Sequence, residues 1–482
     1  MRGIVSWGTY LPYWRLDRSE IAPVAGQGGG RGSRTVAGFD EDAATMAVES
    51  SRRSLRSVGV APEQLLFATA SPAYADKTNA TTVHAALQLD PSVAAFDLGA
   101  SMRSTMGGLL LATRSTVTTV VAAADVRTGL PGSADEANGG DAAATVVIAD
   151  ATPQGPELLA EIVATGSVTS EFLDRWRTPG ERRTKVWDDK FTEVQYRPLV
   201  ATAWRRALDE ASVSPDEVAL VAVAAPTGRV AARLGGVLGG VQVIDSLESS
   251  VGSCGAAHPA MLLASLLEQA GSLEAGSLVA LVSAADGADV LILRTTEALS
   301  RFRPAVTVSD QIASGAQVPY GRFMQWRGML AVEPPRRPEP QRMSGSAAAR
   351  STGWKFGFVG SQDRETGHVH LPPVRVSEGG GRTDDMAPIA MSDVQGSVVT
   401  YTVDRLAYSP SPPIVFAVVD FDGGGRLPVE LCDLGPDELS IGSRVEPTFR
   451  RLATVDGIAN YFWKMRPVRD GAPDEPSDTR EA

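Results

Sequence analysis

The feature that most constrains this sequence is an order of helices and strands that occurs twice within the first three hundred residues. A helix-like run from Thr45 to Val60 is followed by the turn-like APEQ and by the apolar segment LLFATAS (65–71). The same order returns with the run from Leu199 to Val213, the turn-like SPDE and the apolar segment VALVAVAAP (218–226). Helix, turn and apolar strand in this order are typical of βαβ units.

Each copy then continues in the same way, with a helix, a shorter strand, a Gly- or Ser-rich bend that opens another helix, and a further apolar strand. The two bends are Ala100 to Ser104 and SVGSCGAAH (250–258). Two copies of an αβαβ arrangement predict duplicated, mostly parallel sheets covered by helices. The alternative is a single large doubly wound domain whose internal symmetry is coincidental.

The composition changes after residue 318. Residues 319–353 are dense in Pro, Arg, Ser and Ala, so we expect them to build no core and to form either a linker or a strap that wraps the surface. From residue 385 onward, short segments alternate apolar and polar residues between Gly and Pro, which predicts a small antiparallel barrel. Residues 471–482 are polar, and we expect them to be disordered.

Charge and cysteine content exclude several classes of protein. A net charge of −12 would on average repel nucleic acid or an anionic membrane. The two cysteines, Cys254 and Cys432, are too few for a disulfide scaffold or a cysteine-built zinc site. The sequence lacks both an apolar run of about eighteen residues and the pattern of a signal peptide, so we expect a cytoplasmic protein.

The order of elements, together with the segment AFDLGASMRSTMGG (95–108), resembles the thiolase superfamily, in particular the branch of 3-hydroxy-3-methylglutaryl-CoA synthase and ketoacyl synthase III. The C-terminal part resembles the zinc-ribbon and OB-fold proteins that accompany thiolase-like subunits in acyl-CoA metabolism. The segments FDEDAATMAVES and TSEFLDRWRTPG resemble those of a subgroup of proteins in which a thiolase-like part and an OB-fold part are fused in one chain. The resemblance implies an α/β fold, a duplicated thiolase-like αβαβα sandwich followed by a small antiparallel β-barrel of the OB type.

The resemblance also implies a division of the chain, a ligand and an assembly. The ligand would be a CoA thioester, and no further cofactor is expected. The chain would form a homodimer through its thiolase-like domain, and a further acyl-CoA enzyme subunit is a possible partner. The expected segments are a thiolase-like N-terminal half (1–165), a thiolase-like C-terminal half (166–318), the linker (319–353), a degenerate zinc-ribbon segment (354–384), the OB-fold barrel (385–470) and the tail (471–482).

The residues that carry catalysis in condensing enzymes of this superfamily are replaced. A nucleophilic cysteine at a helix N-terminus is expected where AFDLGASM places Met102, and a thioether cannot attack a thioester. The histidine of the H-Q-P-N-G signature corresponds to Ala224 in AAPTGR, and its asparagine to Thr227. The glycine–asparagine pair reads GSCGAAHP, which places Ser253 at the asparagine. Ala70, in TAS, stands at the glutamate that synthases of this branch use as a general base.

The zinc-ribbon signature is degenerate as well. Asp363 and Thr366 stand at its first cysteine pair, and Ser377 with a glycine at its second. We therefore predict no metal site. His368 and His370 lie on one face of a strand and could in principle hold a metal, but two histidines without further ligands are more often exposed strand residues.

A few other residues are candidates for the site. Arg103 and Ser104 lie on the bend expected to face the thioester, and His258 follows the second bend. Cys254 adjoins the signature position, although a buried, inert thiol is the more common reading. A structural role in fixing loops is expected for Asp125, Arg127, Glu136 and Asp141. The run DRWRTPGERR, with Trp176 and Trp187, either forms an insertion that flanks an acyl tunnel or only packs on the surface.

Three hypotheses follow from these residues. The first is a thiolase-fold subunit that binds an acyl-CoA without an acyl-enzyme, as a scaffold, a channelling partner or a non-covalent lyase-type subunit. The second is an enzyme that forms or cleaves a carbon–carbon bond of a CoA thioester, of the acyltransferase or retro-aldolase type, with His258, Ser104 and Arg103 as relocated groups. The third, nucleic-acid binding by the barrel, depends on fold analogy alone and is disfavoured by the acidic charge.

Overall fold

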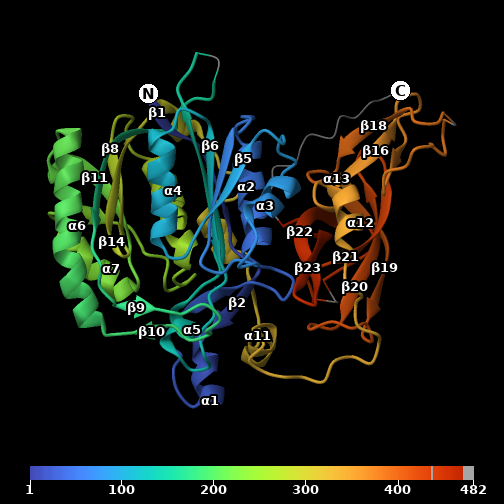
Figure 1. Ribbon diagram of the computed structural model, residues 1–482, viewed down its shortest axis with the longest axis horizontal. Helices are drawn as coiled ribbons and strands as arrows, with labels where there is room; N and C mark the ends of the chain where they lie inside the picture. Colours follow the sequence, from blue (N-terminus) through green and yellow to red (C-terminus); the bar gives the residue numbers. More distant parts are fainter. Residues whose placement is uncertain (154, 381, 436–437, 470–482) are drawn as a thin grey trace.

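The structure is a computed structural model that describes residues 1–153, 155–380, 382–435 and 438–469. Figure 1 shows an α/β body, coloured blue to yellow, beside a smaller orange and red part rich in strands. The residues predicted as a disordered tail, 471–482, lie outside the described residues. Among the described residues, no helix combines the length and the apolar character needed to cross a membrane.

A mixed ten-stranded sheet forms the α/β body, in the order β12-β11-β13-β14-β8-β1-β7-β6-β4-β5. Both halves of the sheet have the same internal order, and they meet where β1 pairs with β8. The first half consists of β1 (Arg2–Tyr10), β4 (Gln64–Ala68), β5 (Ala94–Leu98), β6 (Thr119–Asp125) and β7 (Ala142–Asp150). The second consists of β8 (Ala160–Thr169), β11 (Val218–Ala224), β12 (Gln242–Val243), β13 (Leu278–Ala284) and β14 (Gly287–Thr295). The predicted duplication is thereby confirmed.

The prediction that the pairing is mostly parallel is wrong. Strand β4 pairs in parallel with β5 and β6, and β11 with β12 and β13, whereas the other neighbours within this sheet are antiparallel. The short turn at Ala285 and Asp286 explains one of these pairs, because a connection of this length can join only antiparallel strands. In the sequence, β13, the turn and β14 form one nearly continuous apolar run.

The alternation of side chains along the strands shows which helices cover each face of the sheet. Val121 of β6 and Leu281 of β13 face the central helices α4 (Arg103–Arg114) and α8 (His258–Ala270). Their neighbours Val120 and Ala280 face the outer helices α2 (Ala43–Arg56) and α6 (Asp189–Ala211), respectively. Since successive strand residues point to opposite faces, each half of the sheet lies between a central and an outer helix layer. This is the predicted αβαβα sandwich.

The C-terminal part contains a closed barrel in the order β19-β20-β21-β23-β22, which confirms the predicted OB-type barrel. Its strands are β19 (Gly396–Asp404), β20 (Ile414–Phe421), β21 (Arg426–Leu431), β22 (Arg444–Val455) and β23 (Ile458–Pro467). A three-stranded sheet precedes it, with β16 (Val359–Asp363), β17 (Val369–His370) and β18 (Met386–Ala390).

Short elements connect these parts. The segment predicted as a linker begins with helix α11 (Tyr320–Trp326), whose Tyr320 and Phe323 are buried against β2 and β3, so its first residues do add to a core. The remaining short elements are β2 (Trp14–Asp17), η1 (Arg18–Glu20), α1 (Ile21–Ala25), β3 (Ser33–Val36), α3 (Ala80–Ala86), α5 (Ala134–Asn138), β9 (Arg175–Trp176), β10 (Lys185–Val186), η2 (Pro215–Glu217), α7 (Gly228–Gly235), η3 (Gly255–Ala257), α9 (Glu297–Arg301), α10 (Val308–Ala313), β15 (Ala316–Gln317), α12 (Gly345–Arg350) and α13 (Thr352–Lys355).

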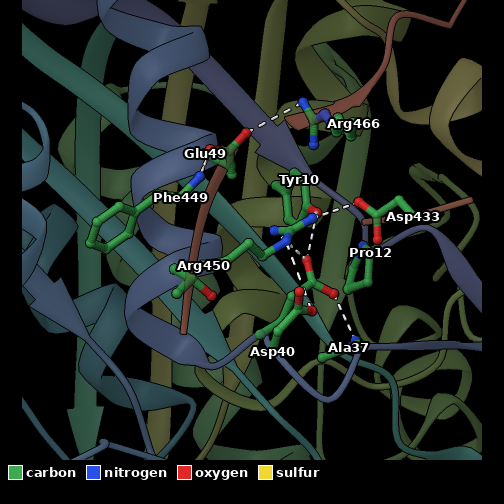
Figure 2. A network of polar contacts seen from close by, with 12 residues as sticks. Tyr10, Pro12, Ala37, Asp40, Glu49, Asp433, Phe449, Arg450 and Arg466 are labelled. Carbon is green, nitrogen blue, oxygen red and sulfur yellow. Dashed lines mark hydrogen bonds and ion pairs between the residues drawn. The ribbon is translucent and has the colours of Figure 1, made fainter. Parts of the chain in front are cut away.

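The barrel is docked on the α/β body through buried charges. Arg450 of β22 forms ion pairs with Glu41 at 2.8 Å and with Asp433 at 2.5 Å, and it donates a hydrogen bond to the Tyr10 hydroxyl at 3.0 Å. Figure 2 shows Arg450 between Asp433, Tyr10 and Asp40. Burial raises the pKa of Glu41 to about 7 even though Arg450 acts to lower it. Because buried charges are stable only when paired, this network ties the barrel to one position on the body.

Candidate functional site

A cavity of about 580 Å³ lies beside the N-terminus of α4. We call it the α4 cavity. A second cavity of about 310 Å³, the α5 cavity, is lined by residues 133–135 and 138 at α5. The two cavities share lining residues: Arg127, Asp174, Arg175, Thr184, Pro226 and Ser253. They therefore adjoin and together offer a path from α5 to the end of α4.

The replaced family positions meet in the α4 cavity. Ala70, Met102 and Ser253 all line it. Met102 is the N-cap residue of α4, and its side chain is only 9% exposed. Ala224 is buried at the end of β11, and Pro226, two residues later, lines both cavities. Within the first half, Ala70 and the bend before Met102 follow the parallel strands β4 and β5, whose carboxyl ends lie at one edge of the sheet. The second bend is held beside them by a hydrogen bond from the backbone N–H of Ser253 to the carbonyl of Asn138 at 2.8 Å.

Asp125, at the end of β6, holds two walls of the α4 cavity together. One of its carboxylate oxygens accepts hydrogen bonds from the backbone N–H of Ala70 at 2.7 Å and from the hydroxyl of Thr69 at 3.0 Å. The other oxygen accepts from the backbone N–H of Ala256 at 2.7 Å. Gly255 has a φ of 56°, and a Cβ there would lie 2.2 Å from Asp125, so only glycine fits. These contacts fit the expected structural role of Asp125.

A buried carboxylate at the junction of the cavities was not singled out in the sequence. Asp174 lies in the loop between β8 and β9 and lines both cavities, yet it is only 3% exposed. Its Oδ2 has no hydrogen-bond partner within the described part of the chain. Burial, followed by the charge of Asp286, raises the pKa of this carboxyl. Tyr196 of α6 also lines the α4 cavity, and its hydroxyl accepts a hydrogen bond from the backbone N–H of Asp286 at 3.0 Å.

Arginines line both cavities among carboxylates of similar number. Arg127 and Arg175 line both cavities, Arg183 lines the α5 cavity, and Arg177 lines the α4 cavity. Arg175 forms an ion pair with Asp135 at 2.5 Å. Within the described ranges, Arg127 takes part in no ion pair, and its guanidinium lies against Gly255, where an added Cβ would be 3.1 Å from Nη1. An anionic ligand could therefore pair with Arg127 without displacing a carboxylate.

Comparisons with known proteins agree with this geometry. The chain is 28% identical over 345 residues to the hydroxymethylglutaryl-CoA synthase of Archaeoglobus fulgidus, covering 68% of this chain and 98% of that relative. It is 28% identical over 353 residues to the same enzyme of Methanothermobacter thermautotrophicus, covering 69% of this chain and all of that relative. The family model "ChsH2, C-terminal OB-fold domain" matches residues 389–450. This chain is a thiolase-like homologue of hydroxymethylglutaryl-CoA synthases with a C-terminal OB-fold domain.

Solved structures support the same fold. An HMG-CoA synthase complexed with CoA matches with a TM-score of 0.58 at 17% identity, over 67% of this chain and 89% of that chain. MvaS in complex with 3-hydroxy-3-methylglutaryl coenzyme A also has a TM-score of 0.58, at 18% identity, over 71% of this chain and 94% of that chain. FabH from Pseudomonas aeruginosa matches with a TM-score of 0.53 at 21% identity, over 61% of this chain and 98% of that chain.

In this thiolase-like homologue, His258 and Cys254 are buried beneath the second bend. The backbone N–H of Cys254 lies 3.5 Å from Nδ1 of His258. Burial, with a smaller contribution from Arg127, lowers the pKa of His258 to about 4, so the ring is neutral at pH 7. The Cys254 thiol donates to the carbonyl of Gly252 at 3.3 Å, and burial raises its pKa. Neither side chain is among the described residues that line the two cavities.

Arg103 and Ser104 are likewise placed outside the cavity walls. The Arg103 guanidinium forms an ion pair with Asp289 at 2.9 Å and donates to the carbonyl of Val168 at 3.1 Å. The Ser104 hydroxyl accepts from the backbone N–H of Ser101 at 3.4 Å. Arg103 thus joins α4 to β8 and β14. The structure therefore does not gather His258, Ser104 and Arg103 around one reaction centre.

The insertion noted in the sequence does reach the site in part. Trp176 and Arg177 line the α4 cavity, and Arg177 donates to the carbonyl of Ala70 at 3.3 Å. Trp187 is exposed and does not contribute to the described walls of either cavity. The segment of residues 174–184 therefore covers the site rather than only packing on the surface.

The degenerate ribbon positions are held by hydrogen bonds. One oxygen of Asp363 accepts from the backbone N–H of Glu365 at 2.9 Å and of Thr366 at 3.3 Å. Hydrogen bonds from Ser377 and then Glu365 lower the pKa of Asp363. His370 contacts the Ser377 hydroxyl at 3.2 Å. No cluster of three or more His, Cys, Asp and Glu side chains arranged to hold a metal occurs in the described portion of the chain.

Proposed function

We propose that this protein binds a CoA thioester in the α4 and α5 cavities without forming an acyl-enzyme. It acts as a non-covalent acyl-CoA-handling or scaffold subunit in acyl-CoA metabolism. The observation that carries this proposal is Met102, which lines the α4 cavity from the N-terminus of α4. A thioether has no proton to lose, so the one residue placed by the helix to attack a thioester cannot do so.

The arginines that line the cavities support a CoA ligand. Arg127, Arg175 and Arg183 line the α5 cavity. CoA carries phosphates, and arginine is the side chain best suited to pair with phosphate oxygens. Two structures with the same fold are described as complexes with CoA and with 3-hydroxy-3-methylglutaryl coenzyme A.

A second function is an active enzyme that forms or cleaves a carbon–carbon bond of a CoA thioester, of the acyltransferase or retro-aldolase type. The observation that favours it is the pair of unmatched groups in the cavity, the buried Asp174 and the cation Arg127. A carboxylate can move a proton and a cation can stabilise an enolate oxygen. In this version, His258, Ser104 and Arg103 position the backbone rather than touch the substrate.

We also propose that two copies associate through β5. This strand is the outer strand of the sheet, and Phe96 on it is 52% exposed. Leu111 on the neighbouring α4 is 56% exposed. An unpaired strand edge with exposed apolar side chains favours pairing with another strand, and a second copy of β5 fits an antiparallel continuation of the sheet.

The test of CoA binding replaces Met102 by cysteine. The variant Met102→Cys is treated with the mixed disulfide of CoA and thionitrobenzoate, which releases thionitrobenzoate when a thiolate attacks it. Because the CoA moiety is guided by the cavities, release should be at least tenfold faster than in the wild type, and free CoA should compete. The wild type is the matched control, because Cys254 is buried and burial raises the pKa of both natural thiols.

A small disulfide without CoA measures the accessibility of the new thiol. If Met102→Cys reacts with the small disulfide and not with the CoA disulfide, CoA cannot reach the end of α4 and the proposal is wrong.

A further inference from the structure

Asp174 is the carboxylate that lines both cavities, and it is almost fully buried, at 3% exposed. Asp135 is paired with Arg175 at 2.5 Å, and Asp125 is bound by backbone N–H groups and hydroxyls. For Asp174, no ion pair occurs within the described ranges, and its Oδ2 is buried without a hydrogen-bond partner. An unpaired buried carboxylate is unfavourable, so its presence at a cavity wall indicates a group kept for a ligand.

The groups that face Asp174 come from three segments. Arg175, its neighbour, lowers the pKa of the Asp174 carboxyl, while burial and Asp286 raise it. Asp174 in turn raises the pKa of Tyr196, after the larger effect of burial. The Tyr196 oxygen already accepts from the backbone N–H of Asp286. Tyr196 is thus a neutral neighbour, and burial holds the pKa of the Asp174 carboxyl above its ordinary value.

We propose that Asp174 is the catalytic residue that takes a proton from the α-carbon of a bound acyl-CoA, while Arg127 stabilises the enolate oxygen. This inference rests on the proposed binding of a CoA thioester. The bond between the α-carbon and its hydrogen breaks, and the proton goes to the carboxylate of Asp174. The electron pair of that bond forms a double bond to the thioester carbon, and the carbonyl oxygen becomes the enolate oxygen. Return of a proton to the α-carbon reverses the step, so no oxidant or reductant is needed.

The positions of Asp174 and Arg127 fit these two roles. Both line both cavities, and so does Ser253, one of the replaced family positions that meet at the end of α4. The carboxylate is buried and the guanidinium lies beside the bend at Gly255. A cation fixed beside the thioester oxygen stabilises the negative charge that develops on it.

The experiment follows hydrogen exchange in deuterium oxide. The full-length protein is incubated with acetyl-CoA and, separately, with 3-hydroxy-3-methylglutaryl-CoA, and deuterium at the α-carbon is measured by mass spectrometry. The affinity for each thioester is measured by calorimetry on the same samples. The wild type should catalyse exchange, with a rate that falls as the pH is lowered through the pKa of Asp174, because only the carboxylate accepts a proton.

Two variants at position 174 and one control define the outcome. Asp174→Asn should lower the exchange rate at least 100-fold and change the affinity less than threefold, whereas Asp174→Glu should retain measurable exchange. Glu171→Gln removes an exposed carboxylate from the same loop, outside the described cavity walls, and should exchange like the wild type.

The results distinguish a failure of the proposed CoA binding from a failure of the proposed role of Asp174. If neither thioester binds, the proposed function fails. If a thioester binds but the wild type does not exchange its α-hydrogens, or Asp174→Asn exchanges as fast as the wild type, the role of Asp174 is wrong and CoA binding stands.

Discussion

At the scale of single residues, the candidate site was predictable where it depends on chain order. Ala70 and Met102 meet in one cavity because they follow the neighbouring parallel strands β4 and β5, whereas Ser253 joins them through its contact with Asn138 and Gly139. The orientation of Arg103 was not predictable, because it depends on Asp289, which is far away in the sequence. Asp174 was noted only as the first residue of the run DRWRTPGERR, and its individual role was not predictable because a loop residue without a periodic pattern gives no signal before its burial is known.

Glu49 offers a test of how a single charge links the two parts of the molecule. Its carboxylate pairs with Arg52 at 2.8 Å and with Arg466 at 3.3 Å, and it accepts from the backbone N–H of Phe449 at 3.1 Å. Although burial raises its pKa, Arg52 and Arg466 outweigh burial, and the pKa falls to about 2.

Because the folded pKa of Glu49 is below its ordinary value of 4.5, its contribution to stability is present above pH 4.5 and is lost as the pH falls toward 2. We expect Glu49→Gln to lower the free energy of unfolding by about 3 kcal/mol at pH 7 and by much less at pH 2.5. Urea denaturation at both pH values measures this, and equal losses at the two values would contradict the assigned pKa.

At the scale of elements, the repeated helix and strand order was predictable because each half buries its own apolar faces. The antiparallel pairs were not predictable, because the turn between β13 and β14 lies within one nearly continuous apolar run and has no signal of its own in the sequence. The linker prediction failed at α11 for a related reason, because Tyr320 and Phe323 are isolated apolar residues that find a buried site far away in the sequence.

The proposed pairing through β5 predicts the effect of a charge at its edge. Phe96→Asp places a carboxylate in an apolar strand interface, so we expect a dimer to dissociate into monomers at micromolar concentration, with the thermal midpoint of the monomer little changed. Analytical ultracentrifugation measures the mass in solution. The matched control is Val243→Asp on β12, the opposite outer strand. A variant at Phe96 that remains dimeric would place the interface elsewhere.

At the scale of the whole molecule, the buried network around Arg450 makes the α/β body and the barrel one unit. Arg450 pairs with Glu41 of the body and with Asp433 of the barrel part, and Figure 2 shows Arg450 beside Asp433. Lys464 of β23 pairs with Asp40 at 2.8 Å. The sequence identified both parts but not this contact, because its residues are separated by about four hundred positions and carry no local signature.

Removing Arg450 should therefore destabilise the docked molecule. Arg450→Met leaves Glu41 and Asp433 buried without their cation, and we expect a loss of about 3 to 5 kcal/mol in the free energy of unfolding. Arg426→Met removes an exposed pair with Asp420 and should leave the free energy of unfolding almost unchanged. Urea denaturation gives both values. Equal effects of the two substitutions would mean that the buried network does not hold the barrel in place.

The most direct test of the whole account is the mass of the protein after saturation with an acyl-CoA. Binding is first shown at equilibrium by dialysis with labelled acetyl-CoA and 3-hydroxy-3-methylglutaryl-CoA. The same samples are then denatured in acid, and the intact mass is measured. We predict bound thioester before denaturation and an unmodified chain afterwards. A chain that retains one acyl group after denaturation would contradict the account, because it would show a nucleophile that Met102 cannot provide.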